Sequence, residues 1–203
     1  MRIIKRLYAW ALLAAVTVSS CSVPKKTLLR YYSQNQTTLD GIEASYKKLY
    51  AQKPFSLGFS DKEFNYVSIT VSTDSLQYIY EFGPQEEARL ADTLVKYKLN
   101  APGIISLVSK MRAMHCTWIN TVDYYVAEKP QFMIFLSTRP VAFSAPFGYK
   151  KYYILAYFPE PQYFDEEGRL YASKRRRRLR KINNEVYSKI NDRVCYTISE
   201  NFR

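Results

Sequence analysis

The sequence contains a single histidine, His115, among 203 residues. One histidine excludes multi-histidine metal sites, and a metal cage built only from thiols or carboxylates has little support in the remaining sequence. The chain also lacks a Gly-rich phosphate loop, a Walker motif and a Cys-x-x-Cys pair, which are the short motifs that mark nucleotide and redox chemistry. We therefore expect no metal and no cofactor.

Long apolar runs are also missing, and glycine is scarce, with six residues in the whole chain. After residue 20 no stretch approaches the 18 consecutive apolar residues that a membrane-spanning helix needs. The hydrophobic content of 47% is ordinary for a globular protein, so low-complexity disorder is not expected. The length suits one domain with a single core.

The N-terminus is organised as a secretory signal. Three basic residues lie within the first six positions, and an apolar region follows from Leu7 to Val18. This region is too short to cross a ~30 Å hydrocarbon core as a helix. Ser19 and Ser20 then precede Cys21, and this order resembles the lipobox of bacterial lipoproteins, in which the cysteine becomes the lipidated first residue.

This resemblance implies a division of the chain into three parts. Residues 1–20 would be a lipoprotein signal peptide, residues 21–37 the lipidated cysteine with a flexible tether, and residues 38–203 a globular domain. An ordinary cleaved signal and an uncleaved anchor are the alternatives. Residue 22 is serine rather than aspartate, and no acid occurs before Asp40. Both features are similar to lipoproteins of the outer membrane that face the periplasm.

Hydrophobic periodicity predicts an α+β fold, a single domain with a mostly antiparallel sheet and helices packed on it. Helical spacing is found in Thr38–Gln52, 84–97, 104–114 and 179–190. Alternating or apolar runs predict strands over Asn65–Ser72, Leu76–Phe82, Thr117–Val126, Phe132–Thr138, Lys151–Phe158 and Val194–Ser199. The strand from Lys151 is apolar on both faces, so we expect it at the centre of the sheet.

The net charge of +12 is concentrated in one place. Eight cations and no acid lie between Gly168 and Asn184, and the rest of the chain after the signal is close to neutral. On the expected helix Arg175 falls on the core side. Either the helix begins after Arg175, or its first turn extends past the edge of the core, or Arg175 has an acidic partner from the turn at 165–167. The candidate anion- or partner-binding residues are Arg176, Arg177, Arg178, Arg180 and Lys181.

A polybasic segment beside a lipid anchor is a known arrangement for binding anionic membranes. Anionic lipid, a glycan or an envelope protein are the partners we consider, and a solvated helix end is the alternative. A nucleic acid is not expected, because the chain is predicted to be exported.

Two cysteines remain after Cys21, namely Cys116 and Cys195. They could form one disulfide or stay as two buried free thiols, and the sequence leaves both open. His115 precedes Cys116, but adjacent residues on a strand point to opposite faces. They are therefore not expected to act as a nucleophile and its base, and no catalytic residue is assigned.

One enzymatic alternative remains, a hydrolase that cleaves envelope glycans with two carboxylates. Its candidates are Asp74, Glu81, Asp123 and Glu128, although nothing in their spacing singles them out. Tyrosines could form a sugar-stacking platform, but aromatic residues in strands are more often core residues; these are Tyr124, Tyr125, Tyr152, Tyr153 and Tyr157. The sequence thus favours a non-enzymatic lipoprotein that acts by binding at the cell envelope.

Overall fold

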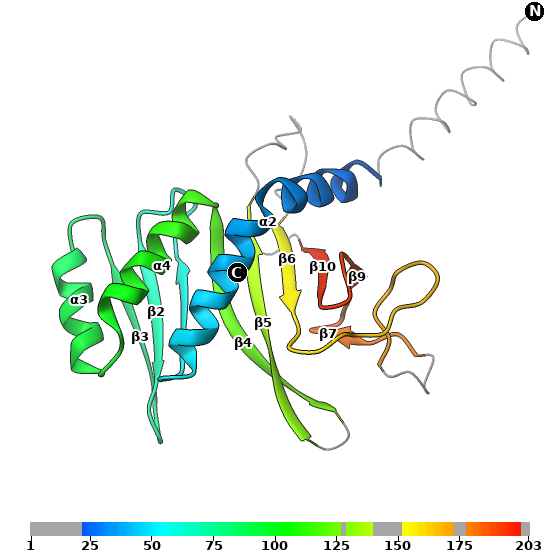
Figure 1. Ribbon diagram of the computed structural model, residues 1–203. Helices are drawn as coiled ribbons and strands as arrows, with labels where there is room; N and C mark the ends of the chain where they lie inside the picture. The colour runs from blue at the N-terminus through cyan, green and yellow to red at the C-terminus, as the bar shows by residue number, and fades with distance from the viewer. Residues whose placement is uncertain (1–21, 127–128, 140–151, 173–177, 200–203) are drawn as a thin grey trace, which may run out of the picture. The chain divides into compact units, whose positions relative to one another are not determined.

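The computed structural model describes residues 22–126, 129–139, 152–172 and 178–199. The chain divides into two compact units, residues 1–36 and residues 37–203, and each is considered by itself. Helices in the described residues are α2 (Ser22–Tyr50), α3 (Glu87–Lys96) and α4 (Ala101–Ala113). Together with a large antiparallel sheet they confirm the predicted α+β class (Figure 1).

The main sheet has eight strands in the order β3-β2-β1-β4-β5-β6-β10-β9, and all the neighbouring strands are antiparallel. Its strands are β1 (Phe55–Phe59), β2 (Val67–Ser72), β3 (Gln77–Phe82), β4 (Cys116–Val126), β5 (Lys129–Thr138), β6 (Tyr152–Tyr157), β9 (Ser188–Lys189) and β10 (Val194–Ser199). A small second sheet pairs β7 (Lys181–Ile182) with β8 (Glu185–Val186). As predicted, β6 is central, and all six of its residues are buried.

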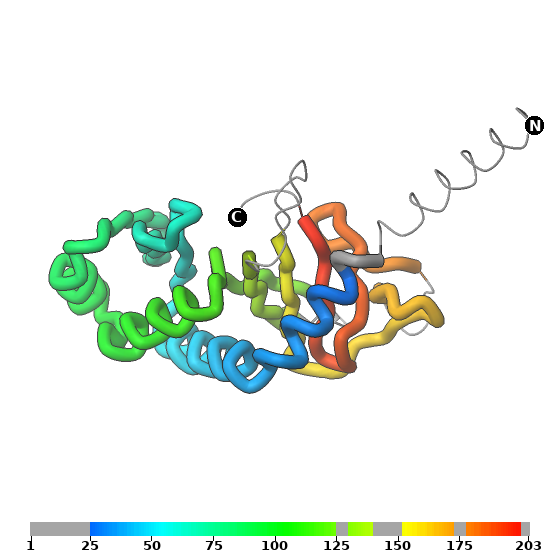
Figure 2. The backbone as a smooth tube through the Cα atoms, turned by 90° about the horizontal axis from the view of Figure 1, so that it is seen from above, coloured from blue at the N-terminus to red at the C-terminus, as the bar shows by residue number. Residues whose placement is uncertain are grey.

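One face of the main sheet is covered by helices. In the second unit, the C-terminal part of α2 buries Leu39, Ile42, Tyr46 and Leu49, which recur at helical spacing. The Tyr46 hydroxyl donates a hydrogen bond of 2.6 Å to the Phe55 carbonyl, and the two rings meet edge to face. Seen from above, this part of α2 and α4 run along the same side of the sheet (Figure 2).

Helix α2 begins at Ser22, sixteen residues before the predicted start at Thr38. The prediction that residues 22–36 lack regular structure is therefore wrong at the level of secondary structure. Leu28 and Tyr32 lie four residues apart and continue the spacing of Leu39 and Ile42, a pattern that the many polar residues between them conceal. No helix in the described part of the chain is both long and apolar enough to cross a membrane.

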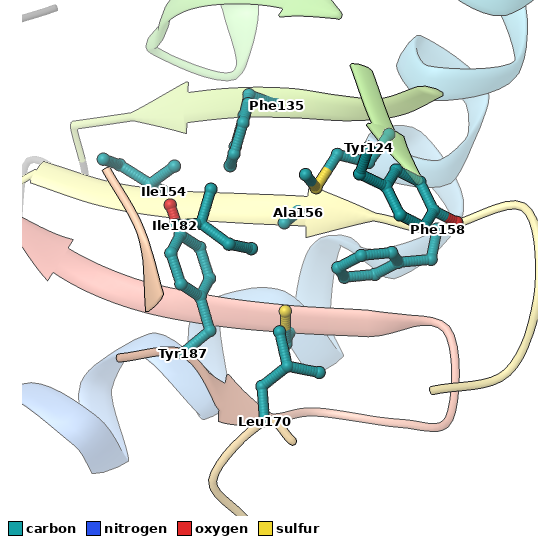
Figure 3. Close-up of a cluster of buried hydrophobic side chains, with 10 residues drawn as sticks. Tyr124, Phe135, Ile154, Ala156, Phe158, Leu170, Ile182 and Tyr187 are labelled. Carbon is teal, nitrogen blue, oxygen red and sulfur yellow. The ribbon is translucent and has the colours of Figure 1, made fainter. Parts of the chain in front are cut away.

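The opposite face of β5, β6 and β10 is covered by described residues from two stretches, 164–172 and 178–190. Leu170, Ile182 and Tyr187 from these stretches are buried against the sheet, as the close-up shows (Figure 3). On the sheet side, the same cluster contains Tyr124, Met133, Phe135, Ile154, Ala156, Phe158 and Cys195. The central strands are thus buried on both faces.

The predicted helix over 179–190 is wrong, because this segment forms the β7–β8 hairpin and then β9. Asn183 and Asn184 have φ values of 51° and 63°, and two consecutive residues with positive φ make the turn that best joins two antiparallel strands. Asparagine tolerates this backbone conformation better than most residues. The helical spacing arose by coincidence, since the buried residues are Ile182 and Tyr187 rather than a stripe from Leu179 to Ile190.

The hairpin turn makes a prediction about stability. Replacing Asn184 by valine should lower the free energy of unfolding by about 1–2 kcal/mol, because a β-branched residue is strained at positive φ. The Asn184→Gly variant should unfold at the same urea concentration as the unaltered protein or at a slightly higher one. Urea titration of both variants checks this, and an Asn184→Val variant as stable as the unaltered protein would contradict the turn.

Candidate functional site

Two carboxylates of the acidic turn at 165–167 pair with Arg169. Asp165 accepts hydrogen bonds from the Arg169 backbone N–H at 2.6 Å and from its Nε at 2.7 Å. Glu167 lies 3.2 Å from the Arg169 guanidinium. We call residues 174–181 the basic run. Two of the three acids near it, Asp165 and Glu167, are therefore already paired with Arg169, which lies outside the run. Arg175 itself lies outside the described residues.

The described residues of the basic run face different environments. Arg178 and Lys181 are exposed, and neither forms an ion pair with any residue in the described part of the chain. Arg176 and Arg177 lie outside the described residues, as does Cys21. Exposed cations without acidic partners are the arrangement that an anionic surface would attract.

Arg180 differs from its neighbours because its side chain is half-buried. Its guanidinium carbon lies 4.8 Å from the centre of the Tyr124 ring, a cation–π geometry. Burial lowers the pKa of the Arg180 guanidinium from its ordinary value, and its backbone N–H donates to the Leu170 carbonyl at 2.8 Å. Arg180 therefore holds the hairpin against β4, and its guanidinium is less accessible to a partner than the side chains of Arg178 and Lys181.

The two cysteines are buried free thiols, so the disulfide left open by the sequence does not form. Cys116 begins β4 and Cys195 lies in β10, with β5 and β6 between those strands. Neighbouring strands lie about 4.8 Å apart, which leaves the two residues well beyond the Cα separation of about 4–7 Å that a disulfide allows. Burial raises the pKa of both thiols, which disfavours the reactive thiolate.

His115 does not pair with Cys116. It follows α4 with a φ of 50°, and its ring packs edge-on against Phe64 at a centroid distance of 5.5 Å. The Cys116 thiol instead lies 3.8 Å from the Met114 carbonyl. The pair therefore lacks the geometry of a nucleophile and its base.

The candidate carboxylates do not converge among the described residues. Glu81 accepts a short hydrogen bond from the Ser60 hydroxyl, whereas Asp74 lies in the exposed turn before β3. Asp123 projects from the other face of the sheet than Glu81, as the strand alternation requires. Glu128 lies outside the described residues.

Four of the five tyrosines considered as a sugar platform are core residues, and the side chain of Tyr125 lies outside the described part of the structure. Tyr124, Tyr152, Tyr153 and Tyr157 are each at most 7% exposed, which leaves no ring face for a sugar.

Trp118 forms a surface feature that the sequence analysis missed. It pairs across strands with Gly58, and a Cβ placed on Gly58 would come within 2.9 Å of the indole Cδ1. The missing side chain thus gives the indole room to lie across β1. Trp118 borders two open hollows of about 490 and 410 Å³ and a smaller one of about 70 Å³ beside Asn183 and Tyr187.

Comparisons with protein-family models, with curated proteins and with solved structures give no match for this chain. Function must therefore be argued from the chain's own surfaces. Two of them stand out in the described residues: the exposed cations Arg178 and Lys181, and the hollowed face around Trp118.

The thiols give a prediction that separates a disulfide from two buried cysteines. We define the unacylated mature chain as residues 21–203 with Cys21→Ser; every described element lies within it. At pH 8 its native thiols should resist iodoacetamide, because their raised pKa keeps them protonated and burial shields them. Unfolding in urea without a reductant should expose two alkylatable thiols by mass spectrometry. Finding none would show that a disulfide had formed.

Proposed function

We propose that this protein is a non-enzymatic lipoprotein of the cell envelope that acts by binding. The lipobox-like end of the signal supplies one attachment, through acyl chains on Cys21. The basic run supplies a second, through an anionic lipid surface. A polybasic patch beside a lipid anchor adds electrostatic attraction to anionic lipid and so strengthens and orients the attachment.

The observation that carries this proposal is the state of the cations on the β7–β8 hairpin. Arg178 and Lys181 are exposed, and Asp165 and Glu167 are occupied by Arg169. These two acids are therefore not available to Arg178 and Lys181, and Glu185 on β8 forms no ion pair with either of them in the described residues. Each cation near an anionic membrane contributes about 1 kcal/mol, so a cluster of this size would orient the domain.

The proposed location is the outer membrane, with the domain facing the periplasm. Support comes from Ser22 in place of an aspartate and from the basic residues Lys25 and Lys26 after the lipidated position. An envelope protein with an acidic surface is the second partner that would fit the hairpin. A nucleic acid partner is not proposed, since the signal directs the chain out of the cytoplasm.

Binding of the unacylated mature chain to vesicles that contain anionic lipid tests the basic surface. The double variant Arg178→Gln/Lys181→Gln should lose about 2 kcal/mol of binding free energy, or about thirtyfold in affinity. Adding Arg176→Gln and Arg177→Gln should remove the salt-sensitive part of binding. Vesicle co-sedimentation across a salt series provides the measurement, because salt screens charge at a Debye length of about 8 Å under physiological conditions.

A matched control removes the same charge elsewhere. Lys48 and Lys110 are exposed on α2 and α4, so Lys48→Gln/Lys110→Gln should bind vesicles far better than the hairpin variant. Arg180→Gln should instead lower the melting temperature, because it loses the contact with Tyr124, worth about 0.5–2 kcal/mol. If the hairpin and control variants bind equally, the basic run does not form the membrane surface.

The lipid anchor is tested separately in cells. A Cys21→Ala variant of the full chain should carry no acyl mass and should leave the membrane fraction after carbonate or salt extraction. Intact mass spectrometry and fractionation against the unaltered protein give the answer. Acylation of this variant, or retention as firm as that of the unaltered protein, would refute the anchor at Cys21.

A further inference from the structure

The face of the main sheet that lies opposite the helices is covered over only part of its width. Residues 164–172 and 178–190 cover β5, β6 and β10 on this face, while β1, β2 and β3 present theirs to the two large hollows. Trp118 on β4 stands at the boundary. Ile79 on β3 is 74% exposed on the open part, which shows that no described segment covers it.

Strand register places the residues of this open face in two rows. Trp118, Gly58, Ser68 and Glu81 are successive cross-strand neighbours from β4 to β3. The next row contains Ser56, Thr70 and Ile79. Cross-strand neighbours share a face, so the indole lies beside a floor of small hydroxyl side chains and one exposed aliphatic side chain.

The chemistry of this floor is polar but nearly uncharged. The described residues that line the two hollows include no lysine and no arginine. Their one carboxylate is Asp123, which borders the 410 Å³ hollow from the other face of the sheet. Glu81, at the end of the first row, is already bonded to Ser60. Anions therefore find no counter-charge here, in contrast to the hairpin. A neutral ligand that offers many hydroxyl groups would match the floor.

Asn120 adds a second, independent observation. It lines both the 410 Å³ hollow and the smaller one beside Trp118. Its Oδ1 is buried and accepts no hydrogen bond within the described part of the chain. Buried polar atoms are nearly always paired in native proteins, with protein, water or ligand. A bound ligand could therefore donate a hydrogen bond to Asn120 Oδ1, and a sugar hydroxyl is a suitable donor.

We propose that the face around Trp118 is a binding site for a neutral oligosaccharide. The indole would pack against the C–H-bearing face of a pyranose ring whose hydroxyls are equatorial. Asn120 Oδ1 would accept a hydroxyl proton, and Ser56, Ser68 and Thr70 would exchange hydrogen bonds along the adjoining units. An aromatic wall with a few placed polar groups, in a hollow of several hundred Å³, is the usual make-up of such sites. This site does not depend on the basic hairpin or on the lipid anchor.

The chain provides its own reporter for this proposal. Its two tryptophans are Trp10 and Trp118, and Trp10 lies within the signal, so the tryptophan emission of the unacylated mature chain, excited selectively over its tyrosines, comes from Trp118 alone. Titration with cellotriose and with N,N′,N″-triacetylchitotriose, two neutral trisaccharides with equatorial substituents, should give a saturable change in emission with at least one of them. Dextran sulfate of similar length should give none, because the face offers no cation.

Calorimetric titration of variants assigns the site. Trp118→Ala should abolish binding, and Asn120→Ala should weaken it at least fivefold. Tyr163→Ala is the matched control, since Tyr163 is an aromatic residue 50% exposed elsewhere on the surface, and it should bind as the unaltered protein does. Circular dichroism melts confirm that each variant folds; if Trp118→Ala does not, Trp118→Phe takes its place, with weakened binding expected.

Three outcomes would overturn this site. The first is a lack of saturable binding of both trisaccharides to the unaltered chain. The second is equal binding by the Trp118 and Tyr163 variants. The third is a dimer, detected by light scattering, that the Trp118 variant disrupts, because the face would then be an interface between copies. None of these outcomes bears on vesicle binding, which tests the basic hairpin separately.

Discussion

The architecture depends on burying β6 from both sides. All six residues of this strand are inaccessible, and a strand with two apolar faces must be covered by a layer on each. Helix α2, from residue 37 onward, belongs to the layer on one face, and residues 164–172 and 178–190 cover the other. The second layer has little regular structure of its own, so side-chain burial at Leu170, Ile182 and Tyr187 holds it in place.

Both candidate surfaces follow from how that second layer is built. Its β7–β8 hairpin buries Ile182 toward the sheet and, by strand alternation, directs Lys181 outward. Arg180 fastens the hairpin through Tyr124, which allows a strongly basic segment to be held next to a core. Among the described residues this layer ends at Trp118, and none of them covers the hydroxyl-rich face of β1–β3 beyond it. One charged and one neutral surface therefore arise from the same incomplete cover.

Local sequence patterns predicted the parts of the fold whose periodicity is strong. Strands β2 to β6 and β10, with helices α3 and α4, match predicted segments because alternation and helical spacing extend over six or more residues there. The first strand, Phe55–Phe59, was not predicted: Phe55, Leu57 and Phe59 do alternate with Ser56 and Gly58, but the pattern spans only five residues and includes a glycine. The hairpin strands β7 and β8 have two residues each, which is too short for an alternating pattern to be recognised. Their turn depends on the backbone conformations of Asn183 and Asn184.

The candidate sites were predicted unevenly for a related reason. Charge is visible in composition, so the basic run was found, although the separate role of Arg180 required its contact with Tyr124. The Trp118 face depends on register, because only the pairing of β1 with β4 brings Gly58 beneath the indole. A glycine within the short apolar segment FSLGF was the available signal, since glycine inside a strand often marks a close approach.

Hydroxyl-radical footprinting of the native, unacylated mature chain tests the incomplete cover most directly. The account predicts rapid oxidation at Leu76, Ile79 and Trp118, together with protection of Tyr153, Leu155 and Tyr187 until the protein unfolds. Protection of Ile79 and Trp118 in the native chain would show that the β1–β3 face is covered. Rapid oxidation of Tyr187 would show that the second layer does not bury β6, and either result would contradict the account.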